Sequence, residues 1–256
     1  MKRVCLYLFV LFLFSCQQEE EIPFVDNEKT ELSSYEENIV MNDGTTRFIY
    51  KGVEYVSDYQ TEGEAIIFQN EIVARLVKTL SQNKVLASYI HSNGVLEYFD
   101  SPSDLENSIL SKSSLSTKAG LNFKVTESAV LTVFEDSKCK GEEWKFTINS
   151  GTTHFKVEYV GEHWNDRISS IDMVCNYRNS SGDNPYPTIA NHGDKCIATF
   201  YEHRDFGGYS ISFTVDPNYP HSYIHYFKSY SLYPGSKKTW NDEVSSLQFS
   251  FDWWKN

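Results

Sequence analysis

Two octets in the sequence carry side chains that could hold a metal ion. WNDRISSI begins at Trp164 and WNDEVSSL begins at Trp240, so one polar pattern occurs twice. Each octet brings amide, carboxylate and hydroxyl oxygens into one short loop, while Ile168 or Val244 can enter a hydrophobic core. Calcium accepts roughly six to eight hard oxygen ligands with few fixed geometric demands. The octets are therefore candidate calcium-binding loops.

The same octets also have a purely structural interpretation. Asn-Asp and Ser-Ser pairs can satisfy backbone amides in turns without any metal. The octets differ in one charge, because Arg167 in the first places a positive charge beside the candidate ligands and Glu243 in the second adds a carboxylate. If calcium binds, we expect the second octet to be the stronger site.

Each octet follows a second repeated block, which must fold in a way that positions it. These blocks are FEDSKCKGEEWKF, from Phe134, and YEHRDFGGYSISF, from Tyr201. Both place Glu directly after an aromatic residue and Gly further on, followed by an alternating strand pattern. The corresponding residues are Glu135 and Gly141 in the first block and Glu202 and Gly208 in the second. Glycine permits a tight hairpin, but one such unit cannot bury its own apolar face, so the two units must pair.

The combined pattern resembles the Greek-key motif of the βγ-crystallin superfamily, of the microbial calcium-binding type. That motif reads aromatic-x-x-x-x-aromatic-x-Gly, followed by (Asn/Asp)-(Asn/Asp)-x-x-(Ser/Thr)-Ser. Tyr201, Phe206 and Gly208 fit it, whereas Cys139 replaces the second aromatic of the first unit. The resemblance covers about residues 128–253 and implies an all-β sandwich of two Greek keys. These keys would span about 128–177 and 196–253.

The resemblance also implies two calcium sites, each shared between an octet and the glutamate block of the other unit. The first would comprise Asn165, Asp166, the carbonyl of Arg167, the hydroxyl of Ser169 and the loop around Glu202. The second would comprise Asn241, Asp242, the carbonyl of Glu243, the hydroxyl of Ser245 and the loop around Glu135.

The N-terminus has the features of a bacterial lipoprotein signal peptide, residues 1–16. Lys2 and Arg3 precede an apolar run of eleven residues, Val4–Phe14, which is too short for a bilayer span of about 20 residues. The following Ser-Cys resembles the end of a lipobox, which implies lipidation of Cys16 and anchoring in the membrane. The alternative is that Cys16 is an incidental thiol.

An acidic stretch follows Cys16. QQEEE looks like the export tag that carries some outer-membrane lipoproteins to the cell surface, although it could equally be part of a solvated tether. Residues 17–41 are rich in carboxylates and lack hydrophobic periodicity, which predicts a flexible spacer. We expect a cell-surface location.

Charge and motif content exclude several function classes. The formal net charge of -12 disfavours nucleic acid and anionic membrane surfaces as partners and favours cations. The sequence has no Ser/His/Asp order, phosphate-binding glycine loop or His-Glu-x-x-His motif. We therefore expect a binding or structural protein rather than an enzyme.

Residues 42–112 predict a small α+β domain, for which no chemistry is evident. Strand patterns flank Lys51-Gly52, and a second hairpin is expected to turn at Ser92-Asn93-Gly94. Residues 71–80 fit either a helix or a strand.

A further helix is expected to begin near residue 101, with Ser101 or Ser103 as its cap. Small polar residues then predict a linker at 113–127. Beyond it, short strands separated by turn residues predict the all-β domain.

Three cysteines lie in that domain. A bond between Cys175 and Cys196 would close a polar loop and stabilise the fold by about 3 kcal/mol. Pairing of Cys139 with either of them is the competing possibility.

The second unit is nine residues longer than the first between its glycine and its octet. The extra residues fall within PNYPHSYIHYFKSYSLYPGS, which is rich in tyrosine. This segment can be a partner-binding loop or a second small core. Its aromatic residues are Tyr219, Tyr223, Tyr226, Phe227, Tyr230 and Tyr233.

Two functions are compatible with these features. The first is a surface lipoprotein whose calcium-stiffened domain serves a structural, adhesion or envelope-interaction role. The alternative, also drawn from the resemblance, is a peptidase inhibitor or killer-toxin-like protein. An inhibitor would need the tyrosine-rich segment to be exposed so that it could enter a protease cleft.

Overall fold

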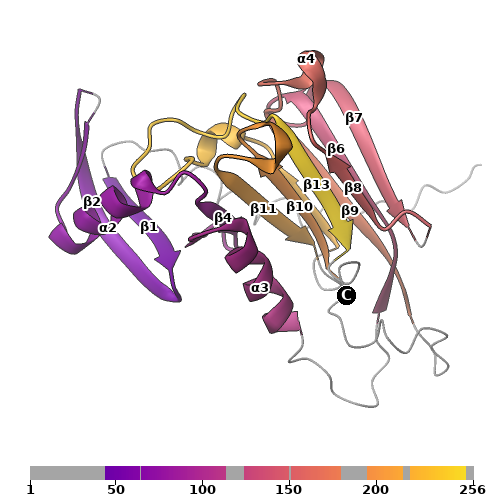
Figure 1. The fold of residues 1–256 in the computed structure, drawn as a ribbon, viewed down its shortest axis with the longest axis horizontal. Helices are drawn as coiled ribbons and strands as arrows, with labels where there is room; N and C mark the ends of the chain where they lie inside the picture. The colour runs from indigo at the N-terminus through magenta and orange to yellow at the C-terminus, as the bar shows by residue number, and fades with distance from the viewer. Residues whose placement is uncertain are drawn as a thin grey trace, which may run out of the picture.

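The computed structural model describes residues 44–63, 65–113, 124–149, 151–179, 195–215 and 220–251. The expected signal peptide, the lipidated Cys16 and the acidic spacer lie outside these ranges. The described chain is mostly β and forms two sheets, one of nine strands and one of four (Figure 1). No helix within the described ranges is long and apolar enough to cross a membrane.

The N-terminal unit consists of five strands and two helices, in the α+β arrangement that the sequence predicts. Its elements are β1 (Gly44–Tyr50), β2 (Val53–Glu62), β3 (Ala65–Phe68), α2 (Glu71–Gln82), β4 (Ala87–Ile90), β5 (Leu96–Phe99) and α3 (Pro102–Ser113). Both predicted hairpins are present. Lys51 and Gly52 turn β1 into β2 with positive φ, and the amide of Gly94 donates to the carbonyl of His91 at 2.8 Å.

Both helices begin at a polar cap. The side chain of Asn70 accepts hydrogen bonds from the amides of Ile72 and Val73, which resolves residues 71–80 as a helix. Ser101 Oγ accepts from the amide of Asp104 at 3.1 Å, so Ser101 rather than Ser103 occupies the cap position of α3.

The C-terminal unit is a two-layered sandwich with very short helices. Its strands are β6 (Lys124–Asp136), β7 (Lys140–Asn149), β8 (His154–Val157), β9 (Ser170–Asn179), β10 (Cys196–Tyr201), β11 (Ser210–Val215), β12 (His221–Ile224) and β13 (Ser246–Phe251). Its helical turns are α4 (Gly161–Trp164), η3 (Arg204–Phe206) and η4 (Phe227–Ser229).

The predicted linker 113–127 is too long at both ends. Ser113 is the last residue of α3, and β6 already begins at Lys124 because its partner β9 extends to Asn179 and satisfies its backbone. Of the predicted linker, residues 114–123 lie outside the described ranges.

The sandwich is built from the two repeated units, the first from β6 to β9 and the second from β10 to β13. Each repeated unit contributes one strand to the sheet that holds most of the other. The nine-stranded sheet has the order β3-β2-β1-β5-β4-β11-β10-β13-β8, and the four-stranded sheet has the order β12-β9-β6-β7. Thus β8, from the first unit, pairs with β13, while β12, from the second unit, pairs with β9. Side chains such as Leu131, Met173 and Phe249 are fully buried between the layers. Burial of each such side chain contributes about 1.5–3 kcal/mol. The two repeated units share this core, so we expect them to fold as one body.

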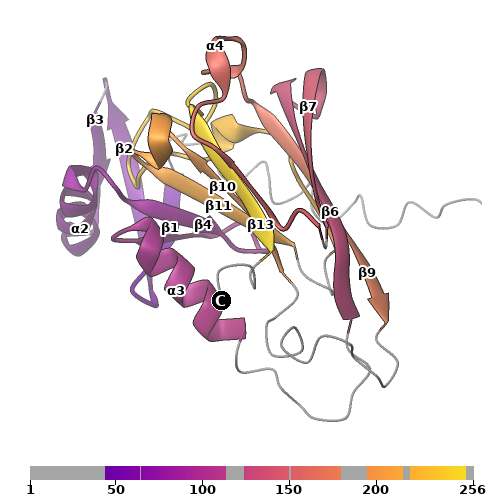
Figure 2. The same ribbon diagram turned by 45° about the vertical axis from the view of Figure 1, so that its right-hand side comes forward.

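The N-terminal unit is joined to the sandwich edge to edge, although the sequence suggested two separate domains. Strand β4 pairs in parallel with β11, with Ala87 opposite Ser210. Ser88 Oγ donates to the carbonyl of Ser210 at 3.0 Å, in a buried position. Figure 2 shows α3 lying along this region, where Leu105 packs with Ala87 and with Ile197 of β10. One continuous sheet therefore runs from the N-terminal unit into the sandwich.

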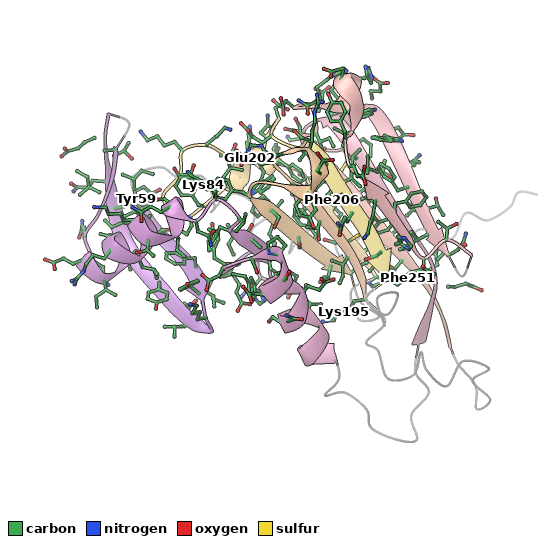
Figure 3. All side chains as sticks on the ribbon, in the orientation of Figure 1. Tyr59, Lys84, Lys195, Glu202, Phe206 and Phe251 are labelled. Carbon is green, nitrogen blue, oxygen red and sulfur yellow. A yellow bond between two sulfur atoms is a disulfide. The ribbon has the colours of Figure 1, made fainter. Side chains whose placement is uncertain are left out.

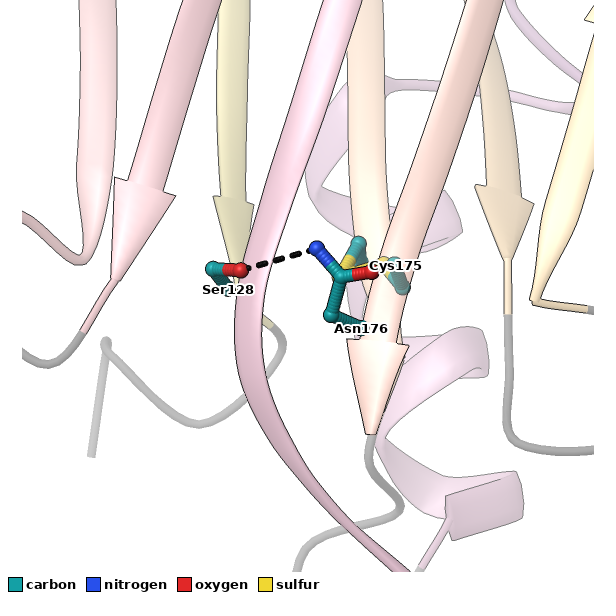
Figure 4. Close-up of a disulfide and its surroundings, with 4 residues drawn as sticks. Ser128, Cys175 and Asn176 are labelled. Carbon is teal, nitrogen blue, oxygen red and sulfur yellow. Dashed lines mark hydrogen bonds between the residues drawn. A yellow bond between two sulfur atoms is a disulfide. The ribbon is translucent and has the colours of Figure 1, made fainter. Parts of the chain in front are cut away.

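Of the cysteine pairings that the sequence left open, the bond between Cys175 and Cys196 is present; it connects β9 to β10, hence one sheet to the other (Figure 4). Beside it, Asn176 Nδ2 donates to Ser128 Oγ at 3.0 Å. Closing a loop with a sequence separation of 21 residues stabilises the fold by about 3 kcal/mol. Cys139 remains a thiol, and its Sγ lies 3.9 Å from Nδ1 of His225.

Candidate metal-binding loops

The two octets lie against each other and exchange matching backbone hydrogen bonds. The amide of Asp166 donates to the carbonyl of Val244 at 3.3 Å, and the amide of Asp242 donates to the carbonyl of Ile168 at 3.4 Å. Ile168 and Val244 are fully buried, as the sequence pattern predicts. The octets are thus related by an approximate two-fold axis, and neither loop is shaped independently of the other.

Within each octet the Asn-Asp pair has the same geometry. Asp166 and Asp242 have φ of 55° and 58°, in the left-handed region that Asp tolerates better than most residues. Asn165 Nδ2 donates to Asp166 Oδ2 at 2.7 Å, and Asn241 Nδ2 donates to Asp242 Oδ2 at 2.6 Å. Both aspartates are exposed, so this turn directs a carboxylate to solvent in each octet.

The second serine of each octet has a structural role. Ser170 Oγ donates to the carbonyl of Asp136 at 2.5 Å and accepts from the amide of Cys139 at 2.9 Å. Ser246 Oγ donates to the carbonyl of His203 at 2.6 Å and accepts from the amide of Phe206 at 3.1 Å. Cys139 therefore takes the backbone place of Phe206, and both serines fix the hairpin loop of their own unit.

The first serine of the first octet contacts the other octet, which differs from the grouping that the sequence led us to expect. Ser169 Oγ donates to Asp242 Oδ1 at 3.1 Å, whereas we expected it beside Asp166. The contact differs from the expected one because the approximate two-fold axis brings Asp242 toward the serine of the opposite loop. In the symmetric position the amide of Asp166 bonds the carbonyl of Val244, the residue before Ser245, but the described residues show no hydrogen bond between the side chains of Asp166 and Ser245.

The glutamates also lie with the opposite octet from the one expected. The amide of Ser169 donates to the carbonyl of Phe134 at 3.0 Å, and the amide of Ser245 donates to that of Tyr201 at 2.9 Å. Each octet leads into a strand that pairs with the first strand of its own unit. This pairing brings Glu135 to the first octet and Glu202 to the second.

Arg167 in the first octet is paired with Glu135. Its Nη2 donates to Glu135 Oε1, and its Nη1 donates to the carbonyl of His163 at 2.8 Å. The hydrogen bond from Arg167 lowers the pKa of Glu135. The positive charge of Arg167, which was expected to weaken cation binding at the first octet, is therefore compensated by Glu135. The Glu135 carboxylate in turn already has a cationic partner.

The negative charge of Glu243 in the second octet is also compensated by a neighbouring side chain. Lys238 Nζ lies 2.5 Å from Glu243 Oε2 and 3.5 Å from Glu202 Oε1. The hydrogen bond with Glu243 raises the pKa of Lys238. Glu202 lies with Phe206 toward one end of the sandwich, and Lys195 and Phe251 lie toward the other (Figure 3). The carboxylate that favoured the second octet thus faces an internal ammonium group.

The donors at these loops fit calcium in chemical type. Asp242 and Ser169 supply converging oxygens, and backbone carbonyls lie in the same loops. Among the described residues, no group of three or more His, Cys, Asp or Glu side chains could hold a metal ion. A metal here would rely on one carboxylate together with hydroxyl and carbonyl oxygens, which suits calcium better than zinc.

The tyrosine-rich segment packs into the main core of the sandwich and does not form a second core of its own. Phe227 and Tyr230 are buried, and Tyr223 and Tyr226 are partly covered, while Tyr219 lies outside the described ranges. The same segment contacts the N-terminal unit. A Cβ atom added to Gly235 would lie 2.9 Å from Val77 and 3.0 Å from Phe68. Directly after the segment, Lys237 Nζ donates to the carbonyl of Gly63. Sequence reasoning missed this internal contact, because no local pattern reports it.

No family model matches the chain, and no curated protein or solved structure is significantly similar to it. The octets are therefore candidate metal-binding loops on the contacts of their own residues alone.

Proposed function

We propose that residues 124–251 form a βγ-crystallin-like module of two Greek keys that binds calcium at its octets and is stiffened by it. The observation that carries this proposal is the convergence of Asp242 and Ser169, from different units, at 3.1 Å. The exchange of β8 and β12 between the sheets supports the Greek-key arrangement.

The electrostatics of the loops also support cation binding. Among the described residues neither Asp166 nor Asp242 takes part in an ion pair, whereas Glu135 and Glu243 do. The hydrogen bonds of Asp242 come from Asn241 and Ser169, which are neutral. An incoming cation would therefore meet an aspartate whose charge is not yet compensated.

In one junction the ligands would be Asp242, the hydroxyl of Ser169 and the carbonyl of Glu243. In the related junction they would be Asp166, the hydroxyl of Ser245 and the carbonyl of Arg167. Because each set draws on both units, a bound ion would oppose their separation. A ligand present at a hundred times its dissociation constant stabilises the folded state by about 2.7 kcal/mol.

The role of the whole protein follows from its expected anchor. We propose that lipid on Cys16 holds the chain at the outer membrane and that residues 17–41 keep the folded part away from the lipid surface. A calcium-stiffened body on such a tether would serve adhesion or envelope interaction.

The test is a calcium titration of the full mature chain, by calorimetry and by thermal unfolding after treatment with EDTA. We expect two bound ions and a rise in Tm of roughly 5–10 °C at saturation. A double variant, Asp166→Asn with Asp242→Asn, should lose the bound ions and the rise in Tm. A matched double variant, Asp58→Asn with Asp104→Asn, removes the same charge elsewhere and should keep both. The absence of any Tm shift at millimolar calcium would refute the proposal.

A further inference from the structure

Lys238 lies between two shielded carboxylates at the second octet. Its Nζ lies 2.5 Å from Glu243 and 3.5 Å from Glu202, whose side chains are 21% and 13% exposed. The Lys238 side chain itself is 55% exposed, so water can reach it and the ammonium group can move away. Glu243 directly follows Asp242 in the sequence. The ammonium is therefore a cation already held by a carboxylate of the second octet.

The backbone of Lys238 is fixed, which keeps the ammonium close. The amide of Lys238 donates to Ser236 Oγ at 2.9 Å, and its carbonyl accepts from Ser236 Oγ at 3.0 Å. The carbonyl also accepts from the amide of Leu232 at 3.1 Å. Two residues later, the amide of Trp240 donates to the carbonyl of Tyr230 at 2.8 Å. Only the flexible side chain needs to move for the ion pairs to open.

The first octet has no equivalent of this lysine. Two residues before its tryptophan stands Glu162, which pairs with Arg204. The positive charge nearest Glu135 belongs instead to Arg167, inside the octet and held by a second bond to the carbonyl of His163. A guanidinium held at two points is less easily displaced than an ammonium on a four-carbon stem. The two loops thus differ in how readily their internal cation can leave.

We propose that Lys238 is a tethered internal cation that competes with calcium at the second octet and so sets the affinity of that site. The inference rests on the proposed function, because it concerns the same ion. With Lys238 in place, Glu202 and Glu243 attract calcium weakly, since their charge is already compensated. When calcium binds, the ammonium swings into solvent while the backbone of the loop stays in place. Lys238 thus offsets the advantage that Glu243 gives to the second octet.

The experiment is calcium calorimetry on the full mature chain carrying Lys238→Met, which keeps the stem and removes the charge. We expect the dissociation constant of one site to fall by about tenfold, within the usual range for coupled binding. Lys237→Met is the matched control. It changes the net charge equally, but its ammonium bonds a carbonyl, so calcium affinity should stay at the wild-type value. Adding Asp242→Asn to Lys238→Met should abolish the gain.

The possible outcomes separate the inference from the proposed function. If the wild type binds calcium and Lys238→Met binds no more tightly, or Lys237→Met gains equally, the inference is overturned and the proposed function stands. If the wild type does not bind and Lys238→Met does, the inference is supported and calcium binding by the native chain is refuted. If neither binds, both are overturned. Unfolding curves without calcium verify that each variant is folded.

Discussion

The first and second octets have the same backbone bonds and different charge partners. In the first, Arg167 of the octet pairs with Glu135 of the upstream block. In the second, Glu243 of the octet pairs with Lys238, which stands two residues before the octet. The reciprocal amide bonds of Asp166 and Asp242 and the clamping bonds of Ser170 and Ser246 are nevertheless alike. Loop shape and local charge can therefore vary separately in this fold, and equal shapes need not bind ions equally.

The largest difference between the octets should appear at their tryptophans. Trp240 is 0% exposed and Trp164 is 8% exposed, at the end of α4 and stacked on the partly buried Trp144. We expect Trp240→Ala to lower the free energy of unfolding by about 4 kcal/mol and Trp164→Ala by about 3 kcal/mol. Urea unfolding measures both.

Trp240→Phe is the control for that comparison. The indole N–H of Trp240 is buried without a hydrogen-bond partner among the described residues, so Phe sacrifices volume but no bond. Its effect should be about 1 kcal/mol. A larger loss for Trp164→Ala than for Trp240→Ala would contradict the burial argument.

The clamping serines should instead behave alike. Ser170→Ala and Ser246→Ala each remove one donor and one acceptor and leave a partly buried carbonyl and amide less satisfied. We expect each to cost about 2 kcal/mol, measured by urea unfolding. A difference above about 1 kcal/mol would show that the two hairpin loops are not equivalent, against the matched geometry.

The smallest effect should be the pH dependence of the Glu135–Arg167 pair. Because Arg167 lowers the pKa of Glu135 below its ordinary value of 4.5, the pair stabilises the fold above that pH. The stabilisation is lost as the pH falls through the lowered pKa. Glu135→Gln should therefore be less stable than the wild type at neutral pH and equal to it near pH 2, as followed by urea unfolding across that range. A constant difference at all pH values would disprove the linkage.

Local chemistry made several features predictable from the sequence. The turns at Lys51-Gly52 and Gly94 depend on neighbouring residues, and so does the cap of α3, which the sequence narrowed to Ser101 or Ser103. The bond between Cys175 and Cys196 was one of the pairings that the sequence left open. The repeated octets likewise identified the loops that meet in space.

The rest depends on contacts between distant segments. Which serine faces Asp242 is decided by the approximate two-fold relation of the loops. Pairing of Ala87 with Ser210 likewise leaves no periodic signature in either strand. No spacing rule within one unit could have given these contacts.

The parallel pairing of β4 with β11 has a consequence for how the chain folds. The partners Ala87 and Ser210 are 123 residues apart (210 minus 87), so β4 is synthesised long before its neighbour exists. Such distant contacts slow folding, and an unpaired strand edge invites pairing with another chain in the meantime. We expect refolding to be limited by this docking step and to lose yield as protein concentration rises. A fragment of the sandwich alone would expose the edge of β11 and self-associate for the same reason.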